Sequence, residues 1–245
     1  MNWYEDEELW QTFYDCMFDE NSFIHAKQQI PQLLNLAKPD IKTILDLGCG
    51  PGRHCLPLAE FGFDVTGLDS SAYLLSKAQE KAKEQNLNIN FIQKNMLDYQ
   101  AQNSFDLIIN MFNSFGYFQT HEQNQQVINN AYNNLTKQGT FIIDTVGKET
   151  LARIIEPVHL TEYENGDIRI ERPLLIDDMQ VFSNEWMLIK DDKVHRFNYQ
   201  HFVYTPLELT HMCQKAGFLH IEVYGSLHGD AYDLDSERLV VVASK

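Results

Sequence analysis

Residues 43–54 read TILDLGCGPGRH, and this stretch decides the fold class. A short apolar run ends in Gly48, Gly50 and Gly52, and a helical pattern follows at once. Glycine adopts positive φ without strain and lets a ligand approach the backbone closely. The first turn of the following helix presents unpaired N–H groups and the positive end of the helix dipole. The stretch therefore predicts a strand, a turn and a helix that receive a nucleotide-like ligand by its negatively charged end.

The spacing of these glycines argues against a dinucleotide. The dinucleotide fingerprint is G-x-G-x-x-G, whose third glycine permits close packing of the helix on the strand. Here the glycines read G-x-G-x-G, and Arg53 stands where that third glycine would fall. The pattern weakens the interpretation of this turn as an NAD site.

Asp69 is the second signal, because it ends the next predicted strand, and a helical stretch follows Ser70 and Ser71. An acidic residue at this place can accept hydrogen bonds from both hydroxyls of a ribose. The other interpretation is that Asp69 caps the helix that follows it. The glycine turn one strand earlier favours the ribose interpretation.

Four segments together resemble the class I S-adenosylmethionine-dependent methyltransferases: residues 45–52 (LDLGCGPG), 65–69 (VTGLD), 91–96 (FIQKNM) and 105–110 (FDLIIN). The resemblance covers about residues 40–150 and, more loosely, residues 206–245. It implies that the glycine turn holds the methionine end of S-adenosylmethionine and that Asp69 binds its ribose. Many relatives carry Asp where Asn95 stands, but an Asn amide oxygen can still accept from the adenine amino group. The cofactor-binding residues implied are Asp46, Gly48, Cys49, Gly50, Gly52, Asp69, Ser70, Asn95, Met96 and Met111.

The periodicity of the chain predicts an α/β fold with a Rossmann-like, doubly wound, seven-stranded and mainly parallel sheet. Strands are expected near residues 43–47, 64–68, 89–92, 105–110, 139–145, 218–224 and 238–243. Helices are expected near residues 53–61, 71–85 and 121–135 and from about residue 206 to Gly217, with one or two more in residues 5–36. Gly139 is expected to stop the helix before it.

Residues 158–204 break this rhythm with short runs of period two and turn signals at Asn165-Gly166 and Asp191–Lys193. Such runs are typical of antiparallel strands. We expect an N-terminal helical cap at 1–38, an S-adenosylmethionine-binding core at 39–150 and 205–245, and an antiparallel β insertion at 151–204. The resemblance implies that this insertion covers the substrate pocket. The insertion could instead extend the sheet or contact a second copy of the chain.

Composition favours a small-molecule substrate. The chain has 245 residues, 44% of them hydrophobic, which is enough for a sizeable core. Its 35 Asp and Glu against 19 Lys and Arg give a formal net charge of −16, a field that repels nucleic acid. The four cysteines lack C-x-x-C spacing, which favours reduced thiols. The acidic N-terminus resembles neither a secretory signal nor a transit peptide, and no apolar run is long enough to span a membrane. We expect a cytoplasmic monomer or homodimer.

Methyl transfer needs few catalytic groups, because the sulfonium of S-adenosylmethionine already makes the methyl group electrophilic. The protein mainly positions the acceptor and excludes water, so no catalytic base is assigned. The resemblance therefore implies an O- or N-methyltransferase with a small-molecule acceptor. The alternatives are an RNA or protein methyltransferase and a non-catalytic S-adenosylmethionine-binding regulatory module. The N/D-P-P-Y/F and Pro-Cys signatures of some nucleic-acid and protein enzymes are missing, and no carboxylate cluster predicts a metal.

Six residues are candidates for the substrate site. The loop after the predicted strand at 105–110 contributes Asn113 and Tyr117, because parallel sheets bind ligands at the carboxyl ends of their strands. His54 could act beside the cofactor or only occupy the first helical turn. His201 could be a base or a buried structural histidine. Arg172 could bind a substrate carboxylate or pair with an acidic residue, and Tyr14 could close the pocket from the N-terminal helices.

Overall fold

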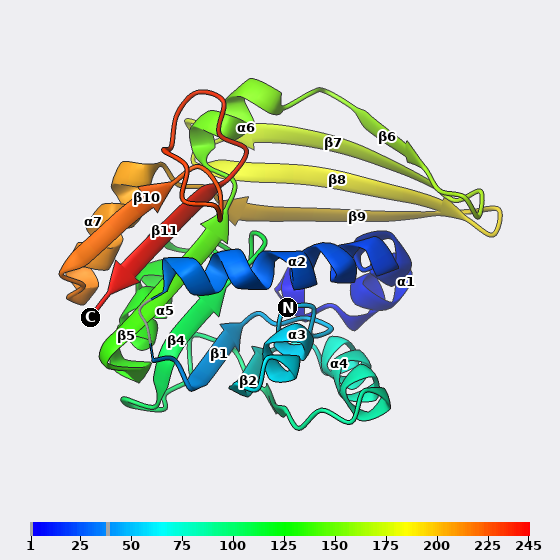
Figure 1. The fold of residues 1–245 in the computed structure, drawn as a ribbon. Coiled ribbons are helices and arrows are strands. Elements are labelled where there is room, and N and C mark those ends of the chain that lie inside the picture. Colours follow the sequence, from blue (N-terminus) through cyan, green and yellow to red (C-terminus); the bar gives the residue numbers. More distant parts are fainter. Residues whose placement is uncertain (1, 38–39) are drawn as a thin grey trace.

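The computed structural model describes residues 2–37 and 40–245, so Met1 and the domain boundary expected at residues 38–39 lie outside the described residues. Its larger sheet has seven strands in the order β10-β11-β5-β4-β1-β2-β3 (Figure 1). All neighbours pair in parallel except those of β11, which is antiparallel to both β5 and β10. This confirms the predicted fold class. The strands are β1 (Thr43–Leu47), β2 (Asp64–Asp69), β3 (Asn90–Gln93), β4 (Phe105–Asn110), β5 (Leu135–Thr145), β10 (His220–Tyr224) and β11 (Leu239–Ser244).

Helices cover both faces of this sheet, and alternate residues of each strand point to opposite faces. In β4, Ile108 packs with α5 and α7, whereas Leu107 and Ile109 pack with α2 and α3. Strands buried on both faces explain the nearly continuous apolar runs in the sequence. The helices of the core are α3 (Cys55–Glu60), α4 (Ala72–Glu84), α5 (His121–Asn134), α6 (Lys148–Ile154) and α7 (Pro206–Ala216).

The expected role of Gly139 is wrong. Helix α5 already ends at Asn134, and β5 begins at Leu135, so Gly139 lies inside the strand. The pairing of β4 with β5 shifts register there, and a Cβ on Gly139 would lie 2.7 Å from Leu135 Cδ2 and 3.1 Å from the Phe105 carbonyl oxygen. Glycine is needed at this position for close packing at a strand irregularity.

Residues 159–202 form a second sheet of four antiparallel strands in chain order. Two of its turns fall at the predicted signals: Gly166 has φ +86°, and Asp191 and Asp192 have φ of +51° and +57°. Figure 1 shows this sheet, in green to gold, above α2 and the end of α1. Its strands are β6 (His159–Glu162), β7 (Ile168–Ile176), β8 (Val181–Lys190) and β9 (Lys193–Phe202).

The N-terminal segment lies against this second sheet. It comprises the 3₁₀ helix η1 (Trp3–Glu5) and the helices α1 (Glu7–Met17) and α2 (Glu20–Leu36). The Trp3 indole N–H donates to the Gln200 carbonyl oxygen of β9 at 2.9 Å, and the ring of Phe13 in α1 lies 5.6 Å from that of Trp186 in β8. None of the described helices is long and apolar enough to cross a membrane.

Candidate active site

The glycine turn after β1 exposes bare backbone at the carboxyl end of the sheet. Gly48, Gly50 and Gly52 have φ of +73°, +54° and +84°, conformations that glycine adopts without strain. A Cβ on Gly48 would lie 3.0 Å from Ser114 Cβ, and one on Gly52 would lie 3.2 Å from Ala78 Cβ of α4. Gly48 therefore allows Ser114 to approach the turn closely, while Gly52 allows α4 to pack against it.

The Asp69 carboxylate ends β2 and faces the turn. Its Oδ2 accepts a hydrogen bond from the Gly50 N–H at 2.8 Å, and its Oδ1 accepts from the Ser71 N–H at 2.9 Å. Burial raises the pKa of Asp69 above its ordinary value, and the backbone hydrogen bonds oppose that shift. The cap of α4 is Ser71, whose hydroxyl accepts from the Leu74 N–H. Asp69 is thus not the helix cap that the alternative interpretation required.

A cavity of about 390 Å³, the cofactor cavity from here on, lies against the turn and Asp69. Its size suits a nucleoside-sized ligand. Seven of the ten expected cofactor-binding residues line it: Gly48, Cys49, Gly50, Asp69, Ser70, Asn95 and Met96.

The other three expected residues, Asp46, Gly52 and Met111, lie outside the lining of this cavity. Asp46 is buried below the turn, where its Oδ2 accepts a hydrogen bond from Cys55 Sγ at 3.3 Å. Burial raises the pKa of Asp46 to about 7. Met111 packs in the apolar core on the α2 side of the sheet.

Arg53 is a lining residue whose role the sequence did not suggest. Its guanidinium lies 5.3 Å from the ring centroid of Phe18 and 4.5 Å from that of Phe112, and it forms no ion pair with a described residue. Burial lowers the pKa of Arg53, although a guanidinium remains charged at neutral pH. An unpaired cation beside the glycine turn is suited to an anionic group of a ligand.

The N-terminal segment forms one wall of the cofactor cavity through Tyr4, Trp10, Met17 and Phe18. Glu7 fastens this wall to the first turn of α4. Its Oε1 accepts from the Ala72 N–H at 2.8 Å, and its Oε2 accepts from Ser71 Oγ at 2.9 Å and the Tyr73 N–H at 3.0 Å. A carboxylate at a helix N-terminus also interacts favourably with the helix dipole. Since the partners are more than 60 residues apart, no local pattern could reveal this contact.

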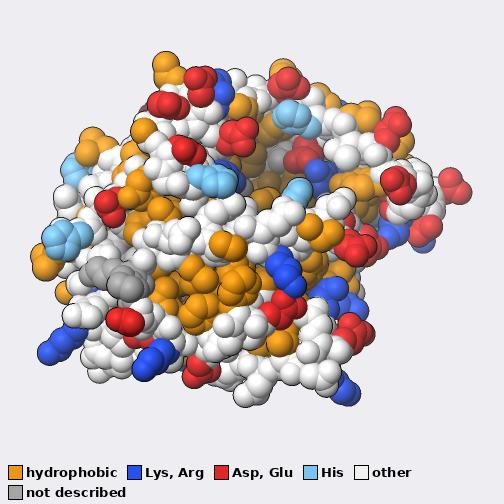
Figure 2. Space-filling view, viewed as in Figure 1, with side chains coloured by type: hydrophobic (Ala, Val, Ile, Leu, Met, Phe, Trp, Pro, Cys, Tyr) orange, Lys and Arg blue, Asp and Glu red, His pale blue; other side chains and the backbone are white. Residues whose placement is uncertain are grey.

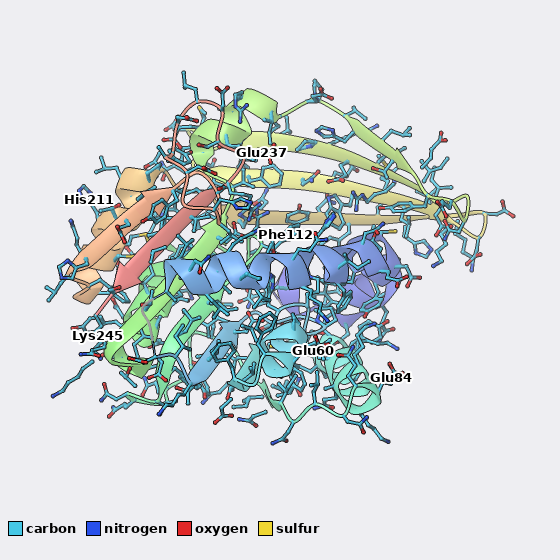
Figure 3. The ribbon with its side chains drawn as sticks, in the orientation of Figure 1. Glu60, Glu84, Phe112, His211, Glu237 and Lys245 are labelled. Carbon is cyan, nitrogen blue, oxygen red and sulfur yellow. The ribbon has the colours of Figure 1, made fainter. Side chains whose placement is uncertain are left out.

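A second cavity of about 230 Å³, the inner chamber, adjoins the first and lies towards the antiparallel sheet. Figure 2 shows the surface hollowed between this sheet and α2, with acidic, basic and histidine side chains around the hollow. Figure 3 labels Phe112 in the same region. Both cavities share six lining residues, which are Trp10, Met17, Phe112, Tyr117, Glu171 and Trp186.

Three of the six substrate-site candidates, Asn113, Tyr117 and His201, line the inner chamber. Asn113 has φ +66°, and its side-chain oxygen accepts from the Val146 N–H at 2.8 Å. His201 donates from Nδ1 to the carbonyl oxygen of Phe202 at 3.1 Å, which makes Nε2 the acceptor nitrogen of the neutral ring. Burial lowers the pKa of His201 to about 4 and raises that of Tyr117.

The structure places the other three candidates, Tyr14, His54 and Arg172, outside both cavities. Tyr14 packs against Phe18 and Tyr73, between α1 and α4. His54 is 5% exposed, its Nε2 lies 3.2 Å from Gln29 Oε1, and burial lowers its pKa to about 3.

Arg172 pairs with Glu185 at 3.1 Å, and its side chain is 54% exposed. The neighbouring odd-numbered residues of β7, Arg169 and Glu171, line the cofactor cavity instead. No group of three or more His, Cys, Asp or Glu side chains within residues 2–37 and 40–245 is placed to hold a metal ion.

Comparison with known proteins identifies the family. Residues 39–203 match the family model described as "Methyltransferase domain". The chain is 27% identical to the glycine/sarcosine N-methyltransferase of Aphanothece halophytica over 83% of this chain and 76% of that protein. It is 30% identical to the ubiquinone biosynthesis O-methyltransferase of Rickettsia felis over 50% and 48% of the two chains.

Solved structures agree on the fold. The crystal structure of an S-adenosylmethionine-dependent methyltransferase from Clostridium acetobutylicum superposes with a TM-score of 0.79 and 17% identity, over 97% of this chain and 96% of that one. The matched family model spans the glycine turn, Asp69 and the antiparallel sheet. The chain therefore belongs to the class I S-adenosylmethionine-dependent methyltransferases, with S-adenosylmethionine as its methyl donor.

Proposed function

We propose that the protein transfers the methyl group of S-adenosylmethionine to an oxygen or nitrogen atom of a small molecule held in the inner chamber. The observation that carries this proposal is the contact between two cavities, one built on the glycine turn and Asp69 and the other walled by the N-terminal segment and the antiparallel sheet. The relatives named as N- and O-methyltransferases support an acceptor of this kind.

The residues of the cofactor cavity fit the methyl donor. Asp69 would accept from the ribose hydroxyls, Arg53 would pair with the methionine carboxylate, and Asn95 and Met96 would border the adenine. Gly48 and Gly50 line the cavity with bare backbone, beside which the amino-acid end would lie. When bound, S-adenosylmethionine supplies a methyl group on a positively charged sulfur.

The remaining task of the protein is to place an acceptor and keep water out. Trp10, Phe112 and Tyr117 stand where the two cavities meet, so they would position the acceptor atom next to the methyl group. The expected division into an N-terminal cap, a core and an antiparallel insertion also fits the binding of an acceptor. The N-terminal segment and residues 159–202 supply most of the residues that line the inner chamber.

Transfer of isotope label tests the proposal. The purified protein is incubated with methyl-labelled S-adenosylmethionine and a cell extract that contains small metabolites, RNA and protein, and labelled products are separated by size. We expect label in molecules below about 1 kDa and stoichiometric S-adenosylhomocysteine. Label found only in protein or RNA would contradict the proposal, and so would tight binding of NAD without binding of S-adenosylmethionine.

A further inference from the structure

The inner chamber is rich in aromatic side chains. Aromatic side chains from three segments of the chain form most of its wall, among them Trp3, Trp10, Tyr117, Trp186, Phe197 and Tyr199. The ring centroids of Trp3 and Tyr117 lie 4.6 Å apart, and those of Trp3 and Tyr199 lie 5.1 Å apart. Aromatic faces carry negative electrostatic potential and attract cations.

Among the described residues that line the inner chamber, Glu171 is the only acidic one, and none is Lys or Arg. Arg169, two residues before Glu171 in the same strand, lines the cofactor cavity instead. Its Nη2 pairs with Glu171 Oε1 at 2.8 Å, and its Nη1 donates to the Cys16 carbonyl oxygen at 3.3 Å. The Arg169 guanidinium also lies 5.2 Å from the ring centroid of Trp186. The chamber therefore offers its occupant aromatic faces and the edge of a Glu171 carboxylate that is shared with Arg169.

A buried acceptor atom next to Glu171 lacks a partner. Asn184 is 3% exposed and lines the chamber, and its Nδ2 donates to Glu171 Oε2 at 3.1 Å. This bond fixes the orientation of the amide, because the opposite orientation would place its oxygen against the carboxylate. Asn184 Oδ1 then has no hydrogen-bond partner among the described residues. A buried polar atom without a partner is costly, so a ligand with an N–H donor would satisfy it.

We propose that the acceptor is an amine, whose nitrogen lies in the inner chamber between the aromatic walls and the Glu171–Asn184 pair. This inference rests on the proposed methyl transfer and specifies its substrate class. The amine nitrogen uses its lone pair to form the new N–C bond. The S–C bond breaks with its electron pair going to sulfur, and the nitrogen keeps its own hydrogens.

The positive charge thus moves from sulfur to nitrogen during the transfer. A carboxylate and aromatic faces around that nitrogen stabilise the charge where it develops, which accelerates the chemical step. A hydroxyl acceptor would instead need a base to remove its proton. His201 is a poor candidate for that role, because burial lowers its pKa to about 4.

The sequence supplies a selective optical probe. All three tryptophans of the chain, Trp3, Trp10 and Trp186, line the inner chamber, so intrinsic tryptophan fluorescence responds to its occupant. Trp10 and Trp186 also line the cofactor cavity, which is therefore kept filled throughout the titration. Three ligands of nearly equal shape isolate the effect of charge: choline, its neutral isostere 3,3-dimethylbutan-1-ol and the anion 3,3-dimethylbutanoate. Each is titrated into protein saturated with S-adenosylhomocysteine.

We expect saturable quenching by choline with an affinity at least tenfold above that of the alcohol, and no binding of the carboxylate. Glu171→Gln should reduce the affinity for choline about tenfold or more. Glu185→Gln is the matched control, because Glu185 lies on the other face of the same sheet and pairs with Arg172 and Arg196. Equal or stronger binding of the neutral or anionic ligand, absence of any response to choline, or an unchanged affinity in Glu171→Gln would overturn the inference.

The label-transfer assay supplies a measurement on the unmodified protein. The labelled product should be a cation at neutral pH and should carry the methyl group on nitrogen. A labelled ether or ester would refute the amine inference while leaving the proposed methyl transfer intact. Failure of the protein to bind S-adenosylmethionine would instead refute the proposed function itself.

Discussion

Asp69 Oδ2 accepts a hydrogen bond from the Gly50 N–H at 2.8 Å, so the carboxylate that faces the cofactor cavity also holds the glycine turn in place. One side chain on β2 thus links the two motifs that define the site. A substitution at Asp69 should affect the ligand contact and the shape of the turn together.

Asp69→Ala should lower the affinity for S-adenosylmethionine by about ten- to a thousandfold. Each charge-assisted hydrogen bond to a ribose hydroxyl is worth roughly 1.5–3 kcal/mol, and 1.4 kcal/mol is a factor of ten. Asp69→Asn should be milder, because its amide oxygen can still accept one bond. Calorimetric titration measures both, with Asp64→Ala at the exposed start of the same strand as the control. An unchanged affinity in Asp69→Ala would mean that the ribose binds elsewhere.

Arg53→Gln should weaken binding of the amino-acid end of the ligand and not of its nucleoside end. Loss of a charge-assisted contact to the methionine carboxylate should weaken binding of S-adenosylmethionine about ten- to a hundredfold. Binding of 5′-methylthioadenosine, which has no amino-acid carboxylate, should change by less than about threefold. Asp69→Ala should weaken both ligands, so it is the matched comparison. Equal losses for both ligands in Arg53→Gln would contradict the assignment.

Glu7→Ala should release the N-terminal segment from α4. The variant loses three hydrogen bonds to the first turn of that helix, each worth about 0.5–1.5 kcal/mol net. We expect dissociation of S-adenosylhomocysteine to become at least several-fold faster, since the segment walls the cofactor cavity. Stopped-flow displacement gives the rate. Glu8→Ala, an exposed neighbour on the same helix, should leave it unchanged.

Asp46 should make the protein less stable as the pH rises from about 4 to 7. Burial raises the pKa of Asp46 from 3.8 to about 7, so the folded protein binds a proton in this range that the unfolded chain has released. The free energy of unfolding must then decrease across this pH range, because unfolding releases a proton. Asp46→Asn removes the titrating carboxyl group. The free energy of unfolding of this variant, measured with urea at pH 5 and pH 8, should therefore change less with pH than that of the unmodified protein. An equally steep dependence in Asp46→Asn would rule out this carboxyl as the source.

Bulk tRNA should not bind measurably in the micromolar range at about 150 mM salt. The formal net charge of −16 opposes the phosphate contacts that supply most of the affinity for nucleic acid. A gel-shift titration at two salt concentrations is sufficient. A saturable micromolar complex with one RNA would favour an RNA methyltransferase instead.

The cofactor half of the site was predictable because its signals are local. Gly48 and Gly50 need positive φ, and Asp69 ends a strand next to that turn, so sequence order alone brings them together. The same holds for the strands of the core, whose apolar runs reflect burial on both faces. The prediction that Gly139 stops a helix is wrong. Glycine is required there because Leu135 and Phe105 approach it closely at a strand irregularity, and no helix-stop pattern encodes that approach.

The inner chamber depends on strand register and on contacts between residues far apart in the sequence. Arg172 belongs to the strand that lines the site, but Arg169 and Glu171 are the residues of that strand that face the cavity. Because side chains alternate along a strand, a change of one position moves a residue to the other face. The contact of Glu7 with α4 and that of Trp3 with β9 join residues 64 or more positions apart. Only the folded chain reveals such pairs.

The N-terminal segment walls both cavities, since Trp10 and Met17 line each of them. It is attached at Trp3 to β9 of the antiparallel sheet and at Glu7 to the start of α4. Any movement of this segment away from the core would open both cavities together. Loading of substrates and departure of products would then share a single opening motion, and its frequency would set an upper limit on turnover.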